Sequence, residues 1–269
     1  MKNTILIGLF LALALISLQP ILSSSSANQD KYQIVREYSE GLAAVNNGEK
    51  RYPNLGIIES PGVWGYIDMA GKLVLPMKFT HAESFHEGLA AVELDHRTGF
   101  IDHEGKMQFE APFDVTMGFH QGIVALIKGG AVAYYDKTGK RLATPPIDPG
   151  PSYHSFSEGL AAIATQGKTG FIDTSGKLVI AAQYEDAGDF SEGLAAVQVK
   201  GELRWCPPDA SGSRQGSPKR FGYIDTSGAM VIPPQFESAG AFHDGWAPVS
   251  DCERRGSVDR NGKTVWSQR

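Results

Sequence analysis

The sequence has few charged residues and almost no cysteine. Charged side chains make up 20% of the 269 residues and hydrophobic side chains 42%, a balance that excludes a solvated, unfolded chain. The formal net charge of -5 argues against a nucleic-acid partner, because contact with the phosphate backbone needs clustered lysine and arginine. Two cysteines offer too few ligands for a metal site. We therefore expect a folded protein with no metal, no cofactor and no nucleic-acid partner.

Sequence motifs of catalytic sites are also missing. The chain has no Gly-x-Ser-x-Gly elbow, no Ser-x-x-Lys motif, no phosphate-binding loop and no His-Glu-x-x-His spacing. Three of its histidines share one repeat position with serine, which predicts a solvent-exposed site and not a metal ligand. These are His86, His120 and His243, which alternate with Ser39, Ser157 and Ser191. We therefore expect that the protein is not an enzyme.

The N-terminal segment has the layout of a signal peptide. A lysine precedes the apolar run Ile5 to Leu18, and a proline and four serines follow it. Small residues at Ser25 and Ala27 predict cleavage after Ala27, so that residues 1–27 are removed. The alternative is an uncleaved anchor over Ile5 to Leu22, at the short limit for a membrane span, and only then do we expect contact with a membrane. Both interpretations predict an exported protein, which is periplasmic, displayed on the cell surface or secreted.

Two short signatures each recur six times. An Asp-x-x-Gly tetrad preceded by Ile, Tyr or Val begins at Asp68, Asp102, Asp136, Asp173, Asp225 and Asp259, and an aromatic-x-acid-or-Gln-Gly signature ends at Gly41, Gly88, Gly122, Gly159, Gly193 and Gly245. In the regular units an Asp lies 20 residues before the next signature Gly, which lies 14 before the following Asp, so the period is 34 residues. The tetrads predict turns, in which Asp accepts backbone N–H groups and Gly supplies a positive φ. The acids before the signature glycines suggest local turn chemistry as well.

Each unit is expected to contain three short strands, the first two joined as a hairpin. In the fifth unit these are Leu194 to Val199, Phe221 to Asp225 and Ala229 to Ile232. Insertions over Asn46 to Val63 and Gly201 to Lys219 fall at hairpin tips. The aromatic residues of the linkers between units should pack beneath the neighbouring unit. The mature chain, residues 28–269, is thus predicted to be one all-β domain of six tandem units over about residues 32–266.

Two assemblies of six such units are possible. The units can close into a propeller-like ring or stack into an open β-solenoid with two free ends. An open stack exposes an apolar face at each end, and neither terminal unit shows an evident polar replacement. We therefore favour the ring and keep the solenoid as the alternative.

The repeat resembles the WG repeat family. The clearest copy reads Trp64-Gly-Tyr-Ile-Asp-Met-Ala-Gly-Lys-Leu-Val-Leu-Pro76 and continues to Glu87-Gly-Leu-Ala-Ala-Val92. The similarity extends from Tyr32 to Trp266. The Trp-Gly pair that gives the family its name occurs only at Trp64 and Gly65, and the third unit has Ala133 in place of the glycine. The resemblance implies a β-repeat domain without established catalytic residues and with an interaction role.

Two groups of residues at hairpin tips are candidate sites. Cys206 and Cys252 lie at the tips of consecutive units of an exported chain, which predicts a disulfide. The second insertion also carries a basic and aromatic cluster that could anchor a protein or a glycan. Its members are Arg204, Trp205, Arg214, Lys219 and Arg220.

These observations favour an exported, non-enzymatic protein that presents hairpin loops to a protein or envelope partner. A carbohydrate or cell-wall binding module is the second hypothesis, in which Trp64, Trp205 and Trp246 stack on sugar rings. A hydrolase with a site in a central channel is the third.

Overall fold

A computed structural model describes residues 31–48, 50–52, 57–60, 62–149, 154–205, 216–252 and 254–267. The regular secondary structure in these ranges consists of β-strands alone, so the all-β prediction is confirmed. Within the same ranges no helix is long and apolar enough to cross a membrane. The predicted signal peptide and its cleavage site lie outside the described residues.

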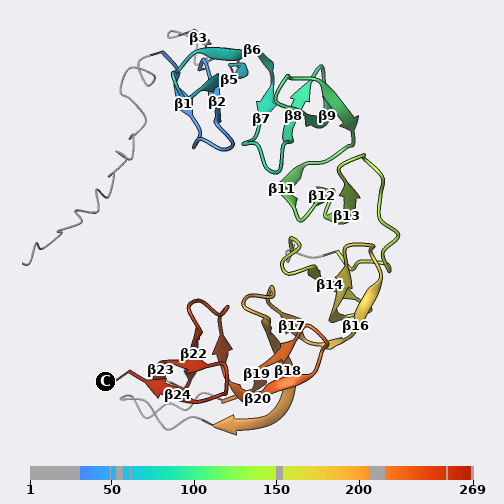
Figure 1. The fold of residues 1–269 in the computed structure, drawn as a ribbon, viewed down its shortest axis with the longest axis vertical. Coiled ribbons are helices and arrows are strands. Elements are labelled where there is room, and N and C mark those ends of the chain that lie inside the picture. The colour runs from blue at the N-terminus through green and yellow to red at the C-terminus, as the bar shows by residue number, and fades with distance from the viewer. Residues whose placement is uncertain are drawn as a thin grey trace, which may run out of the picture.

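Six antiparallel sheets, one for each predicted unit, follow one another along an arc (Figure 1). The first unit contains β1 (Ile34–Val35), β2 (Leu42–Asn46), β5 (Trp64–Asp68) and β6 (Leu73–Phe79), and the second contains β7 (His81–Ala82), β8 (Ala90–Leu94), β9 (Arg97–Ile101) and β10 (Met107–Glu110). The third contains β11 (Val115–His120), β12 (Ile123–Lys128) and β13 (Ala131–Asp136), and the fourth contains β14 (Leu160–Thr165), β15 (Lys168–Asp173) and β16 (Leu178–Tyr184). The fifth contains β17 (Asp186–Ala187), β18 (Leu194–Trp205), β19 (Gly216–Asp225) and β20 (Met230–Phe236), and the sixth contains β21 (Ser238–Ala239), β22 (Trp246–Asp251), β23 (Arg254–Asp259) and β24 (Thr264–Trp266).

The linkers form strands that the sequence did not reveal. In the first, second, fifth and sixth units a two-residue linker strand pairs with the first strand of the repeat, as β1 does with β2, and in the third unit the longer β11 does so. In Figure 1 these linker strands lie toward the inner side of the arc, whereas β6, β16 and β20 lie toward its outer side. The first and last sheets occupy the two ends of the arc.

The two insertions also adopt strand structure. In the first unit, β3 (Lys50–Tyr52) and β4 (Ile57–Ser60) form a separate two-stranded hairpin. In the fifth unit the insertion lengthens the repeat hairpin itself, because β18 and β19 remain paired as far as Trp205 and Gly216. The fifth-unit strands are therefore longer than the sequence predicted.

The Asp-x-x-Gly turns are confirmed in all six units. At each turn the Asp Oδ1 accepts hydrogen bonds from the amides two and four residues later. At Asp173 the donors are the amides of Ser175 and Lys177, at 2.9 and 3.1 Å, and Gly176 closes the turn with a φ of +88°. The Ser175 hydroxyl also bonds Asp173, and this bond lowers the pKa of the Asp173 carboxyl.

The glycine of the Trp-Gly pair has a steric explanation. A Cβ added at Gly170 would lie 2.6 Å from the Ile180 carbonyl oxygen and 2.7 Å from the Ala182 amide nitrogen, because the outer strand β16 bends closely over this position. The equivalent glycines in four other units meet their outer strands in the same way. Ala133, which replaces this glycine, belongs to the unit whose described residues contain no outer strand. The glycine is thus required where a third strand crosses it.

Aromatic pairs form the core at every junction between units. The second strand of each of the first five units contributes a buried Tyr or Phe whose ring packs against the second aromatic residue of the following linker, with centroids 4.9 to 5.6 Å apart. The pairs are Tyr66 and Phe85, Phe100 and Phe119, Tyr134 and Phe156, Phe171 and Phe190, and Tyr223 and Phe242. The three tyrosine hydroxyls donate to linker carbonyl oxygens. The predicted packing of the linkers beneath their neighbours is therefore confirmed.

The acid before each signature glycine joins one unit to the next. Its own φ is near +53° and the glycine follows at about +80°, so the two residues form a tight turn between linker and first strand. The side chain reaches the next unit and accepts a hydrogen bond from the signature glycine amide there. This bond occurs at all five junctions, from Gly88 to Glu40, Gly122 to Glu87, Gly159 to Gln121, Gly193 to Glu158 and Gly245 to Glu192. These residues therefore lie in local turns, as predicted, and also act across the junctions, which the sequence did not reveal.

The serines that alternate with histidine also act across junctions. The hydroxyls of Ser39, Ser157 and Ser191 donate to the carbonyl oxygens of Phe85, Phe190 and Phe242 in the following linkers. The prediction of a solvent-exposed position therefore holds for His86 and His243, which are exposed, and not for His120 or the three serines, which are half-buried.

Candidate binding groove on the hairpin-tip side

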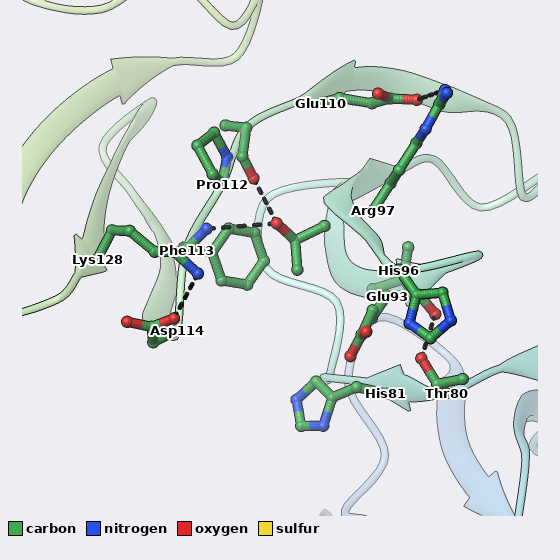
Figure 2. A pocket seen from close by; sticks show the side chains of 13 residues that line it. Thr80, His81, Glu93, His96, Arg97, Glu110, Pro112, Phe113, Asp114 and Lys128 are labelled. Carbon is green, nitrogen blue, oxygen red and sulfur yellow. Dashed lines mark hydrogen bonds and ion pairs between the residues drawn. The ribbon is translucent and has the colours of Figure 1, made fainter.

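Neighbouring strands in each sheet are antiparallel, so successive turns lie on opposite sides of the arc. The turns between the first and second strands of each unit lie on one, which we call the tip side, and the Asp-x-x-Gly turns lie on the other. Between the second and third units a cavity of about 860 Å³ opens on the tip side (Figure 2). We call it the tip groove.

Thr98, Ala111 and Phe113 form the base of the groove. The Thr98 hydroxyl donates to the Ala111 carbonyl oxygen at 2.6 Å and accepts the Phe113 amide at 3.3 Å. Phe113 is buried and belongs to the junction core. Thr98 occupies the repeat position of Trp64, so a short hydroxyl side chain stands here where the first junction has an indole. The base is rigid, and space remains above it.

Two exposed ion pairs lie on opposite sides of the groove (Figure 2). Arg97 lies 3.4 Å from Glu110, and Lys128 lies 2.6 Å from Asp114. The Gly129 amide and the Lys128 ammonium together hold the pKa of the Asp114 carboxyl below its ordinary value. Exposed pairs of this kind contribute little to stability, so their side chains are available to a ligand.

His81, Glu93 and His96 also line the groove (Figure 2). His81 Nε2 lies 2.6 Å from Glu83, and this hydrogen bond lowers the pKa of the Glu83 carboxyl. Within the described residues the half-buried Glu93 carboxylate makes no hydrogen bond or ion pair. The groove therefore presents both signs of charge around a partly apolar base.

The groove is open because Arg97 points away from the boundary between the second and third units, which we call the seam. Between the fourth and fifth units, Lys168 and Glu185 occupy the repeat positions of Arg97 and Asp114. These two residues form an ion pair of 2.6 Å across their seam. Arg97 instead turns toward Glu110, and Asp114 turns toward the tip of its own unit. The seam is left unbridged.

The chemistry of the lining indicates binding. The Thr98 hydroxyl donates to the Ala111 carbonyl oxygen, which is not a general base, so the hydroxyl is not activated as a nucleophile. His81 is paired with an acid outside the lining. The groove is suited to an extended polar ligand that carries charges of both signs.

A second cavity, of about 480 Å³, is lined by the linkers β17 and β21. His154 Nδ1 lies 2.7 Å from Asp189 there, and the other lining residues are mostly Gly and Ala. A histidine and carboxylate pair can act as a general base, but no Ser, Thr or Cys lines this cavity.

The structure separates the members of the predicted basic cluster. Arg204 and Trp205 lie at the end of β18, in register with Ser217 and Gly216. Lys219 is exposed, whereas Arg214 lies outside the described residues. Arg220 is only 6% exposed and its guanidinium lies 3.6 Å from Glu237, so we assign it a structural role at the junction and remove it from the partner-facing set.

The predicted disulfide lies partly outside the described residues. Cys206 is not described, whereas Cys252 lies in the tip turn of the sixth unit with a φ of +53°. The bond between them stays a prediction.

Sequence spacing did not reveal a group of possible metal ligands beside Cys252. Glu237, Asp251 and Cys252 each offer one ligand atom, and these three atoms lie within 4.8 Å of one another. Arg220 and Arg254 lie beside the two acids, at 3.6 and 3.1 Å. Two guanidinium groups already balance these carboxylates, which disfavours a cation at this place.

Comparisons with known proteins agree with this architecture. The fold defines the chain as a β-repeat protein built from small antiparallel sheets. The family model for the WG containing repeat matches residues 64–95, 170–202 and 221–251, in the first, fourth and fifth units and the segments that follow them. At these three stretches the resemblance to the WG repeat seen in the sequence is confirmed.

No curated protein matches the sequence. Among solved structures, the chain is similar to Hsv2p of Kluyveromyces lactis, with 11% identity, a TM-score of 0.42 and coverage of 84% of this chain and 74% of that one. It is also similar to the C-terminal WD40 domain of Sif2, with 10% identity, a TM-score of 0.39 and coverage of 84% and 66%. A protein of unknown function from Bacteroides caccae matches with 11% identity, a TM-score of 0.30 and coverage of 86% and 91%. We draw nothing further from these distant similarities.

Proposed function

We propose that this chain is an exported, non-enzymatic binding protein that presents its tip side to a protein or envelope partner. The observation that carries the proposal is the tip groove, where two exposed ion pairs flank an open cavity of about 860 Å³. The lengthened hairpin of β18 and β19 extends from the same side. The hairpin arises from an insertion and the groove from a junction that no ion pair bridges, so both distinguish this chain from a regular stack.

A charge-reversal experiment tests the groove. The double variant Arg97→Glu and Lys128→Glu is compared with Lys72→Glu and Lys177→Glu, two exposed lysines in Asp-x-x-Gly turns on the opposite side. We expect capture of the partner from an envelope extract to fall at least about ten-fold in the groove variant alone, with cross-links mapping to the groove in the unaltered protein. Equal capture by both variants contradicts the proposal.

Export is tested separately. We expect the mature protein recovered from the producing cell to begin at Asn28, as measured by N-terminal sequencing or intact mass. A chain that retains residues 1–27 in the cytoplasm contradicts this part of the proposal.

The hydrolase hypothesis has one observation in its favour, the His154 and Asp189 pair. Turnover of a model ester or glycoside that is lost in Asp189→Asn would support it. Because no Ser, Thr or Cys nucleophile lines that cavity, we retain binding as the proposed function.

A further inference from the structure

The outward face of the sixth sheet differs from the equivalent faces of the other five. Each of the first five sheets presents a buried aromatic residue to the unit that follows it, as Tyr66 and Tyr223 do. In the sixth sheet Ser257 occupies this repeat position. The absence of an evident polar replacement in the terminal units, which we used to favour a ring, is therefore corrected for this face.

A hollow of about 340 Å³ lies at this position. It is lined by Trp246, Gly256, Ser257, Val265, Trp266 and Ser267. Trp246 is 43% exposed, whereas Leu194 at its repeat position in the fifth unit is buried. Val265 is 55% exposed, and the valines at its repeat position, Val74, Val179 and Val231, are also exposed. The serine leaves free the space that an aromatic ring fills elsewhere, and large apolar side chains surround it.

One wall of the hollow is fixed by packing. Trp266 packs against the junction core, and the Arg254 guanidinium lies over its ring at 4.6 Å from the centroid. A Cβ at Gly256 would lie 2.9 Å from Trp266 Cε3, so the glycine permits the close approach of this indole. The second indole, Trp246, lies at the start of β22 and is half exposed to solvent.

We propose that this hollow binds a neutral saccharide. Its lining combines two indoles, a valine and two serine hydroxyls and contains no charged side chain. A sugar ring has an apolar C–H face that packs on an indole and a hydroxyl edge that bonds serine. The volume lies at the lower end of the range for small-molecule sites.

The same features argue against a second copy of the chain as the occupant. At all five inner junctions the following unit docks through an aromatic ring of the preceding sheet, and Ser257 has removed that ring. The exposed apolar side chains here, Trp246 and Val265, offer a small area compared with the roughly 800 Å² per partner of a stable interface.

The saccharide hypothesis of the sequence analysis is thereby relocated. Trp64 is 9% exposed and belongs to a core cluster, so it is not available to stack on a sugar. Trp205, at the end of β18, is not among the residues that line this hollow. The site on the sixth sheet is separate from the tip groove, so its failure would leave the proposed function intact.

Titration with tetrasaccharides tests the proposal. Chitotetraose, cellotetraose and maltotetraose are titrated into the full mature chain and followed by tryptophan fluorescence and calorimetry. We expect at least one to bind with a Kd below about 1 mM. Trp246→Ala should weaken binding at least about ten-fold, and Ser257→Tyr, which restores the aromatic residue of the other units, should abolish it. Val179→Ala, at an exposed valine of β16, should bind normally.

Three outcomes overturn the proposal. The first is that none of the three sugars binds at millimolar concentration, and the second is that Trp246→Ala and Ser257→Tyr bind as well as the unaltered chain. The third is a concentration-dependent dimer by sedimentation that Trp246→Ala dissociates, which would identify a second copy as the occupant. Circular dichroism and the Tm of each variant show whether a loss of binding reflects unfolding.

Discussion

Single side chains connect the units of this protein to one another. Glu87 shows the mechanism, because its carboxylate accepts the amides of Gln121 and Gly122 in the next unit and lies 3.1 Å from Lys137. Hydrogen bonds to a charged acceptor are stronger than neutral ones, although exposure to water reduces their net contribution.

We expect Glu87→Ala to lower the free energy of unfolding by about 1 kcal/mol, because two backbone amides lose a charged acceptor. Urea denaturation followed by circular dichroism measures this change. The control is Glu104→Ala, at an exposed glutamate whose side chain makes no hydrogen bond in the described structure, with an expected change within about 0.5 kcal/mol. Equal losses in the two variants would show that the acid does not link the units.

We expect the folded state to lose stability in acid because of the turn aspartates. Hydroxyl groups of Thr138, Ser175 and Ser227 lower the pKa of Asp136, Asp173 and Asp225 below the ordinary value of 3.8. A lowered pKa in the folded state stabilises the fold above that value, and the contribution is lost as the pH falls through the folded pKa.

We therefore expect the urea midpoint to be steady between about pH 5 and 7 and to fall below about pH 4. Ser175→Ala should raise the pKa of Asp173 toward its ordinary value, as measured by NMR titration of the carboxyl. An unchanged titration of Asp173 in this variant would contradict the assigned cause.

At the scale of the strand, the close approach of the outer strand determines which residue can occupy the second strand. Gly170→Ala places a methyl group against the backbone of β16, and we expect a loss of about 1–3 kcal/mol. The matched control is Gly188→Ala, where the nearest atom to the added Cβ is 3.9 Å away and φ is not positive. Its expected change is within about 0.5 kcal/mol, as measured by urea denaturation. Similar losses at both glycines would refute the steric explanation of the Trp-Gly motif.

In the whole molecule, the interfaces between units hold the sheets together. Each sheet is too small to exclude water alone, so stability depends on the interfaces between neighbours. The predicted Cys206 and Cys252 disulfide would join the tips of the last two units, and Cys252, the only cysteine within the described residues, is not free there.

We expect the intact mass of the protein recovered from the producing cell to rise by two hydrogen atoms on reduction. Replacing both cysteines with serine should lower the free energy of unfolding by about 2–4 kcal/mol, because the unfolded chain is no longer constrained. Reduction of the unaltered protein should produce the same loss, whereas reduction of the double variant should have no effect. Identical masses before and after reduction would rule the disulfide out.

The sequence by itself determines the number of units, the Asp-x-x-Gly turns and the positions of the hairpins. These features are local, since a turn needs only an acceptor at Asp173 and a positive φ at Gly176, three residues apart. Only the tertiary structure decides which side chains act between units. Glu87 and Gln121 are 34 residues apart, and no local rule states that one caps the other. The burial of Trp64 and Arg220, the opening of the tip groove and the hollow beside Ser257 likewise depend on which neighbour covers each face, because burial is a property of packed pairs of sheets and not of one strand.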